Sequence, residues 1–211
     1  QMKAKKAIES GRFKDEIVPV PIRVKKETVL FEVDEHPKFN TTVEKLAKLP
    51  PVFKAGGTVT AGNSCGMNDG ASALILMSEE KAQELQVQPM ARIVSFATGS
   101  LDPKYFGEAP VLGINMALKK AGLTIDQIDL IECNEAFAVQ TIAVARQVKW
   151  DDAKLNVNGG AIALGHALGS TGGRLMTTLL YELKKRDGKY GLATACTGGG
   201  MGVATIVENL K

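Results

Sequence analysis

IDLIECNEAFAVQTIA, residues 128–143, decides the fold class of this chain. Its first six residues form a short β-type run, and the residues through Phe137 and Ala143 predict a helix. A strand that runs directly into a helix is the repeating unit of α/β proteins. We therefore expect a layered fold in which apolar strands are buried between helices.

The alternation of strand and helix continues upstream of this stretch. Strands are predicted at 71–77 (ASALILM) and 91–97 (ARIVSFA), with a helix near 79–85 between them. A second helix is predicted from apolar residues spaced three or four apart, and Gly122 ends it. Its apolar positions are Val111, Ile114, Leu118 and Ala121.

Toward the carboxyl terminus, one more helix precedes two strands. The strands are predicted at GLATAC (191–196) and GVATIV (202–207). The apolar stripe of the helix consists of Leu175, Met176, Leu179, Leu180 and Leu183. Residues 1–66 differ, because prolines and other turn formers leave room only for short helices at the opening residues and near 42–49.

Length and composition favour a folded protein with a sizeable core. The chain has 211 residues, 45% of them hydrophobic, and a net charge of +3. No apolar run is long enough to cross a bilayer, and the charged opening residues lack the apolar centre of a secretory signal. We expect a cytoplasmic protein that binds neither a membrane nor nucleic acid.

The cysteines give no sign of a disulfide framework or a metal site. Cys65, Cys133 and Cys196 lie far apart, with no Cys-x-x-Cys pair and no histidine at ligand spacing. Positive charge is concentrated in residues 1–54, which carry 12 Lys and Arg against 8 Asp and Glu. Such a segment is usually a solvated surface, but it also suits a phosphorylated ligand.

Three polar clusters fall where predicted strands and helices meet. Asn134 opens NEAFA after one strand, His166 precedes a helix within NGGAIALGHALGSTGG (158–173), and Cys196 ends another strand. Sites in α/β folds gather at such strand ends. Taken singly, Asn134 could be a helix cap, His166 a hydrogen-bonded core residue and Cys196 a buried inert thiol. Their shared position favours a functional interpretation of all three.

These side chains suit chemistry on an acyl or carbonyl group. Cys196 is followed by TGGGMG, whose glycines allow backbone N–H groups to approach a ligand and hold an oxyanion. A cysteine at this point can act as a nucleophile or as an acid and base. Asn134 can orient a water or donate to a carbonyl oxygen. The glycines around His166 resemble a phosphate-binding loop only loosely.

The clusters resemble the signature blocks of the thiolases, the acetyl-CoA acetyltransferase family. The resemblance covers essentially the whole chain, in the family's order and spacing. It implies the thiolase-like layered αβαβα fold, with this chain as its C-terminal half: a mixed five-stranded sheet covered by helices, plus part of the loop domain. The blocks are GTVTAGNSCGMNDGA (57–71), NEAFA (134–138), NVNGGAIALGH (156–166) and CTGGGMG (196–202).

The resemblance implies reversible condensation of two acetyl-CoA to acetoacetyl-CoA, or thiolysis of 3-ketoacyl-CoA. His166 would activate a cysteine nucleophile, and its Nε2 would bind the thioester oxygen. Asn134 would hold the water that completes this oxyanion hole, and the N–H of Gly198 would belong to a second one. Cys196 would move the proton at the α-carbon, with thiol pKa values lowered toward neutrality.

Coenzyme A and acetyl-CoA are implied as substrates, with no tightly bound cofactor and no metal. Lys38 would lie near the nucleotide phosphates, which gives the basic excess of residues 1–54 a purpose. The pantetheine arm would be lined from two sides. The lining residues would be Ala61, Cys65, Ala136 and Phe137.

The resemblance divides the chain into a partial loop domain (1–66), the last strand and helix of the N-terminal core domain (67–89) and the C-terminal thiolase domain (90–211). No cysteine here matches the family's nucleophile, so the chain is expected to be inactive alone and to need the missing N-terminal half as a partner. A homodimer or homotetramer is also implied.

Two other hypotheses remain open at this point. A ketoacyl-synthase type of condensing enzyme is disfavoured, because those enzymes use a second histidine where Cys196 stands. A non-catalytic coenzyme A-binding or scaffold subunit predicts coenzyme A binding without turnover.

Overall fold

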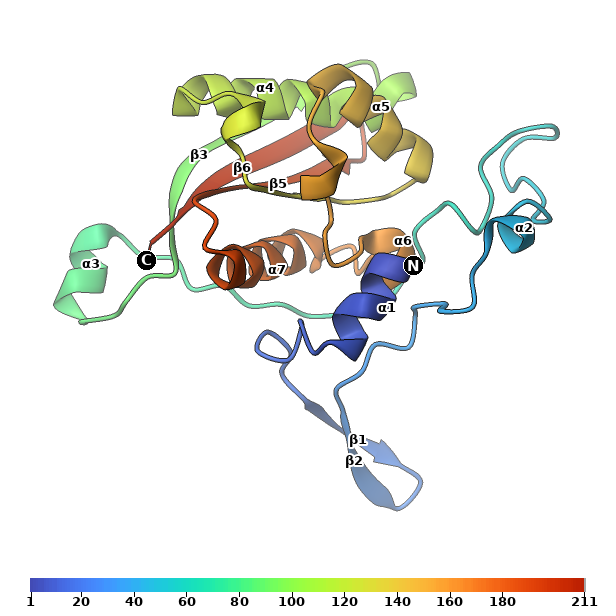
Figure 1. Cartoon of the computed structure of the whole chain (residues 1–211), viewed down its shortest axis with the longest axis horizontal. Helices are drawn as coiled ribbons and strands as arrows, with labels where there is room; N and C mark the ends of the chain where they lie inside the picture. The colour runs from blue at the N-terminus through green and yellow to red at the C-terminus, as the bar shows by residue number, and fades with distance from the viewer. Residues whose placement is uncertain (211) are drawn as a thin grey trace.

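A mixed four-stranded sheet with helices on both faces forms the body of the molecule (Figure 1). The computed structural model describes residues 1–210. Strand β6 is central and antiparallel to β3 and β5, whereas β4 is parallel to β5. The order is β3 (Ala91–Ser100), β6 (Met201–Asn209), β5 (Tyr190–Thr197) and β4 (Leu130–Cys133). The expected α/β fold, with a mixed sheet covered by helices, is confirmed.

Within residues 1–210, the expected fifth strand of this sheet is absent. Beyond β4, the pairing among these residues is limited to an isolated parallel bridge between Leu155 and Ile131. The next residue, Asn156, has a φ of 41°, which no strand residue adopts, and its side chain bonds to the backbone of Cys133. A side chain therefore takes the place of a strand's backbone at this edge.

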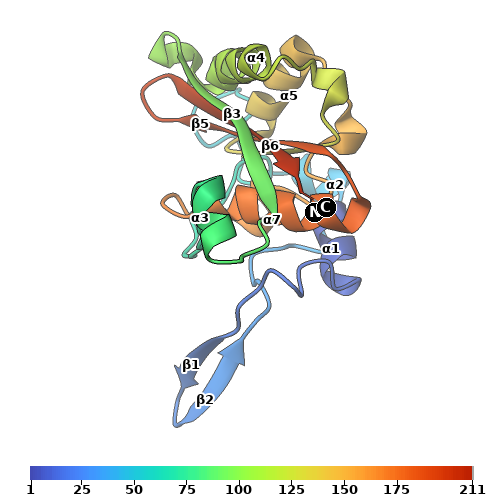
Figure 2. The same ribbon diagram turned by 90° about the vertical axis from the view of Figure 1, so that its left-hand side faces the viewer.

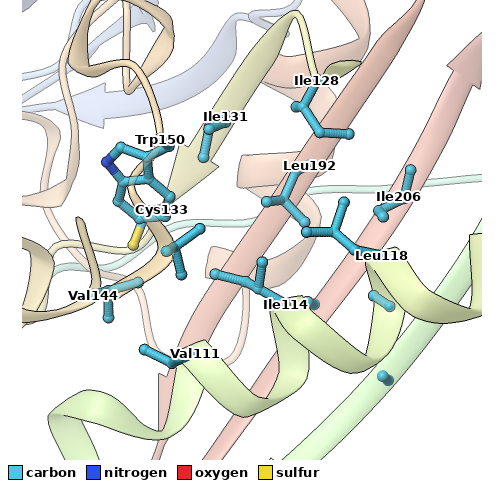
Figure 3. Close-up of a cluster of buried hydrophobic side chains, with 14 residues drawn as sticks. Val111, Ile114, Leu118, Ile128, Ile131, Cys133, Val144, Trp150, Leu192 and Ile206 are labelled. Carbon is cyan, nitrogen blue, oxygen red and sulfur yellow. The ribbon is translucent and has the colours of Figure 1, made fainter. Parts of the chain in front are cut away.

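Helices α4 (Ala109–Ala121) and α5 (Ala138–Val148) cover one face of the sheet, and α7 (Thr171–Arg186) covers the other. Side chains of β4 alternate between the two faces: Ile131 packs into the α4 and α5 core (Figure 3), whereas Leu130 packs with α7. Helix α4 ends at Gly122 in the left-handed conformation (φ 66°), as predicted. The remaining short elements are η1 (Pro103–Glu108), η2 (Ile125–Gln127), η3 (Asp152–Lys154) and α6 (Ala161–Leu164).

The stretch ASALILM (71–77) is not a strand, so the strand predicted there is wrong. No described backbone segment pairs with it, and its side chains are exposed, with Ile75 at 88%. An apolar run indicates burial, but a strand also needs a hydrogen-bonding neighbour. The helix predicted after this run is present as α3 (Glu79–Glu84).

Residues 1–66 contain the two expected short helices, α1 (Met2–Glu9) and α2 (Val43–Leu46). They also contain a hairpin that was not predicted, β1 (Val20–Val24) and β2 (Glu27–Phe31), which projects from the body (Figure 2). Its turn carries Lys25 at φ 57°, without the Gly or Asn that would have signalled it. Within residues 1–210, no helix is both long and apolar enough to cross a membrane.

Candidate active site

Asn134 and Cys196 lie at the same edge of the sheet. Because β4 and β5 are parallel, their carboxyl ends coincide, and the register pairs Cys133 with Thr194. The N–H of Asn134 donates to the carbonyl of Thr194 (2.9 Å), two residues before Cys196. The topology thus places an amide and a thiol on neighbouring strand ends.

The Asn134 side chain is 2% exposed, and its Oδ1 has no hydrogen-bond partner among the described residues. A buried acceptor without a partner costs free energy, which favours an interpretation in which a water or ligand completes it. The helix-cap interpretation is wrong, because α5 follows Phe137 and has no side-chain cap.

His166 lies in the loop between α6 and α7 and is tied to the segment 67–68. It forms a parallel bridge with Met67, and its N–H donates to Oδ1 of Asn68 (3.2 Å), while its carbonyl accepts from the N–H of Asn68 (3.4 Å). Beside it lies a hollow of about 440 Å³, lined by 68–72 and 167–170. Two sequence blocks that lie about 100 residues apart thus meet at the histidine.

The ring of His166 has its Nδ1 2.7 Å from Oγ1 of Thr171. That hydroxyl donates its only hydrogen to the carbonyl of Ala167 (2.9 Å), so it must accept from Nδ1. The network therefore assigns the proton to Nδ1 and leaves the Nε2 lone pair free. Burial, together with the positive charge of Arg174, lowers the pKa of His166, which favours the neutral imidazole that a general base requires.

Replacing Thr171 by valine is expected to lower kcat about tenfold in a protein that uses His166 as its base. Valine keeps the shape but removes the acceptor that holds Nδ1–H, so the ring loses its tautomer and orientation. Steady-state kinetics of Thr171→Val measure the effect. Thr177→Val is the matched control, because the Thr177 hydroxyl donates to the Gly173 carbonyl within its own helix, α7. Equal losses in both variants would contradict the assigned role.

Cys196 is half-buried, and burial raises the pKa of its thiol; the neighbouring Cys65 raises it further. The expectation of a lowered thiol pKa is therefore wrong for Cys196, since no positive charge acts on it strongly enough to offset burial. In this state Cys196 is a protonated thiol, suited to donating a proton. After it, Gly198 is exposed, and a side chain added there would meet no atom within 4 Å.

Cys65, Ala136 and Phe137 are brought together. The N–H of Cys65 donates to the carbonyl of Ala136 (3.1 Å), and Ser64 forms a bridge with Phe137. The Phe137 ring stands edge-on to Phe53, with centroids 5.9 Å apart. These contacts join the 57–71 block to NEAFA.

No described bond ties Lys38 or Ala61 to this group. Both are exposed, and within residues 1–210 no hydrogen bond or ring contact joins either one to the residues around Cys65. Nor does any hydrogen bond link His166, Asn134 and Cys196 to one another in the described part of the chain. Among those residues, no group of three or more His, Cys, Asp or Glu is arranged to hold a metal ion.

Sequence reasoning missed Thr171, Glu135 and Asn156. Thr171 orients His166, and the other two join the NEAFA block to the glycine-rich block. All three lie in the quoted stretches, but only the tertiary contacts distinguish them from their polar neighbours.

A neutral imidazole, a protonated thiol, a buried amide oxygen without a partner among the described residues and an open glycine turn define a class of site. This class is suited to acid–base and oxyanion chemistry on an acyl group. Comparison with known proteins agrees with this class. Two family models match the chain: "Thiolase, N-terminal domain" over residues 1–80 and "Thiolase, C-terminal domain" over residues 87–209. The chain belongs to the thiolase family.

Curated relatives and solved structures support the same family. The acetyl-CoA acetyltransferases of Syntrophomonas wolfei and Escherichia coli are 60% and 51% identical, over 100% of this chain and 53% and 54% of their own lengths. The Bacillus anthracis acetyl-CoA acetyltransferase structure has a TM-score of 0.96 at 48% identity, over 99% of this chain and 53% of its own. The structure of human mitochondrial 3-ketoacyl-CoA thiolase in complex with CoA has a TM-score of 0.94 at 50% identity, over 99% of this chain and 52% of its own. The chain spans about half the length of the curated relatives it matches.

Proposed function

We propose that this chain supplies the acid–base residues and the coenzyme A-binding residues of an acyl-CoA acetyltransferase. The observation that carries the proposal is that His166 is a neutral imidazole with its Nε2 free, while Cys196 is a protonated thiol on the strand end next to that of Asn134. The reaction is reversible thiolysis of a 3-ketoacyl-CoA, with condensation of two acetyl-CoA in the other direction.

In the thiolysis direction, a nucleophilic thiol gives its proton to Nε2 of His166 and bonds to the C3 carbonyl carbon. The bond between C2 and C3 then breaks, and Sγ of Cys196 protonates C2 with the released electron pair. Acetyl-CoA leaves, and the acyl group remains on the nucleophile. The thiol of coenzyme A then gives its proton to the Cys196 thiolate and bonds to the acyl carbon, and the released nucleophile takes its proton back from Nε2 of His166. Nε2–H of His166, a water held by Asn134 and the N–H of Gly198 stabilise the oxyanions.

The nucleophile itself has no counterpart among the three cysteines. Cys133 is fully buried, and burial raises the pKa of its thiol to about 12. Cys65 lies in the block proposed to bind coenzyme A, and Cys196 is assigned the C2 proton. We therefore propose that an N-terminal half outside these 211 residues carries the nucleophile; "full-length protein" below means both halves in one chain.

The site residues assigned to coenzyme A also remain a proposal. The backbone hydrogen bond between Cys65 and Ala136 and the bridge between Ser64 and Phe137 hold these residues together, which supports a pantetheine arm at that point. Lys38 is solvent-accessible, which suits the phosphate end of the ligand, and Ala61 stays assigned to the pantetheine arm with Cys65. The division at residues 66 and 89 and a cytoplasmic location remain proposals too.

Coenzyme A-dependent cleavage of acetoacetyl-CoA tests this function. The full-length protein is expected to cleave acetoacetyl-CoA, and residues 1–211 alone are expected to show no turnover, because they lack the nucleophile. Loss of the enolate absorbance follows the reaction. Coenzyme A binding without any cleavage by the full-length protein would favour a non-catalytic subunit and overturn the proposal.

A further inference from the structure

The carboxylate of Glu135 joins the two sequence blocks that carry Asn134 and His166. Its Oε1 accepts from Nδ2 of Asn156 (2.9 Å), and its Oε2 accepts from the backbone N–H of Ile162 (3.1 Å). Ile162 belongs to the single turn of α6; the N–H groups of Ala163 and Leu164 donate to the Gly160 carbonyl, and that of Ile162 donates to this carboxylate. One side chain therefore reaches from the end of β4 to the helix that precedes His166.

Asn156 fixes the other end of this link. Its Oδ1 accepts from the N–H of Cys133 (2.8 Å), and its Nδ2 donates to the Cys133 carbonyl (2.9 Å) as well as to Glu135. Its own N–H donates to the carbonyl of Ile131 (2.8 Å). Asn156 is 2% exposed, so these bonds are shielded from water. The carboxylate is thus held against the end of β4 rather than free to rotate.

The backbone of α6 is packed directly against this carboxylate. A Cβ added to Gly160 would overlap the carboxyl group of Glu135. A second side chain also bonds to this turn: Nδ1 of His36 donates to the carbonyl of Ala163 (2.9 Å), because a carbonyl can only accept. The single turn between Gly160 and Gly165 is therefore held by two side chains from distant parts of the sequence.

We propose that Glu135 is a positioning residue that sets His166 relative to Asn134. Glu135 directly follows Asn134 in the chain, and Ile162 is four residues before His166. Displacing α6 moves the imidazole while leaving the amide in place. An error of about 1 Å in such geometry costs up to about a hundredfold in rate. The expected loss of rate rests on the proposed function. The expected displacement of α6 does not depend on it.

Two measurements on the full-length protein test the proposal. Glu135→Gln keeps the shape and the acceptor, but its amide cannot accept from both Asn156 and Ile162. We expect kcat per active site, counted by the acyl-enzyme burst, to fall at least tenfold. We also expect the amides of 160–166 to exchange hydrogen at least tenfold faster. The control Glu84→Gln, on exposed α3, changes neither quantity.

The second variant, Gly160→Ala, forces the carboxyl group away without removing it and is expected to give both effects. A merely structural defect would lower the number of active sites and leave kcat per active site unchanged, which would overturn the proposal. Unchanged exchange at 160–166 in Glu135→Gln would also overturn it. If the unmodified full-length protein cleaves no acetoacetyl-CoA, the proposed function fails, and the exchange result alone upholds or overturns the link through Glu135.

Discussion

Replacing Cys196 by alanine in the full-length protein is expected to lower kcat for acetoacetyl-CoA thiolysis by about 10²- to 10⁴-fold, the usual worth of a positioned general acid. Alanine cannot protonate C2, so the electron pair released from the C2–C3 bond must wait for a proton from water. Steady-state assays of both proteins at one pH measure the loss.

The matched control is Cys133→Ala, which removes a thiol that faces the α4 and α5 core rather than the sheet edge. We expect its kcat to stay within about twofold of the unmodified protein, although its stability falls. Cys65→Ser is a second control, because a hydroxyl of nearly the same size can line the ligand without titrating. Equal kcat values for Cys196→Ala and the unmodified protein would contradict the assignment of Cys196 as the group that protonates C2.

The stability of the 211-residue chain is expected to fall as pH rises from 5 to 8, in part because of Glu132. This residue is 2% exposed, and burial raises the pKa of its carboxyl from 4.5 to about 8. The positive charge of Arg174, whose Nη1 lies 3.3 Å from Oε2 of Glu132, lowers the pKa but does not offset burial. The unfolded chain releases the proton above pH 4.5, whereas the folded chain keeps it, so each pH unit costs up to about 1.4 kcal/mol. Three other carboxyls act on the group: Glu16, Glu135 and Glu182.

Denaturant unfolding followed by the fluorescence of Trp150, the only tryptophan, measures this dependence. Glu132→Gln cannot ionise, so its unfolding free energy should decline less between pH 5 and pH 8. Part of the decline remains, because burial also raises the pKa of Glu16 to about 7. Glu84→Gln serves as the control. A decline in Glu132→Gln as steep as in the unmodified chain would contradict the buried, protonated state.

Most of the sheet and its covering helices could be predicted from the sequence, because their apolar periodicity is local. The stripe on α7 and the closing glycine of α4 each place a helix without knowledge of its neighbours. The stretch 71–77 could not be placed in this way, since strand formation depends on a backbone partner elsewhere. The hairpin β1–β2 was missed because its Lys25–Lys26 turn carries no turn signal.

The candidate site divides in the same way. Asn134 and Cys196 could be placed together, because parallel strands end at the same edge. The loop of His166 is tied instead to the segment 67–68, its tautomer depends on Thr171, and α6 is bonded to Glu135. The contact with Thr171 spans five residues and the contact with Glu135 spans 27, and neither follows a periodic pattern, so the sequence offers no signal for them.

The exchange of the C2 hydrogens of acetyl-CoA with deuterated water tests the central claim most directly, because it isolates the proton transfer assigned to Cys196. The full-length protein is expected to incorporate deuterium at C2, and mass spectrometry measures the incorporation. Cys196→Ala is expected to lose this exchange, whereas Cys133→Ala is expected to retain it. Deuterium incorporation at an undiminished rate in Cys196→Ala would contradict the account.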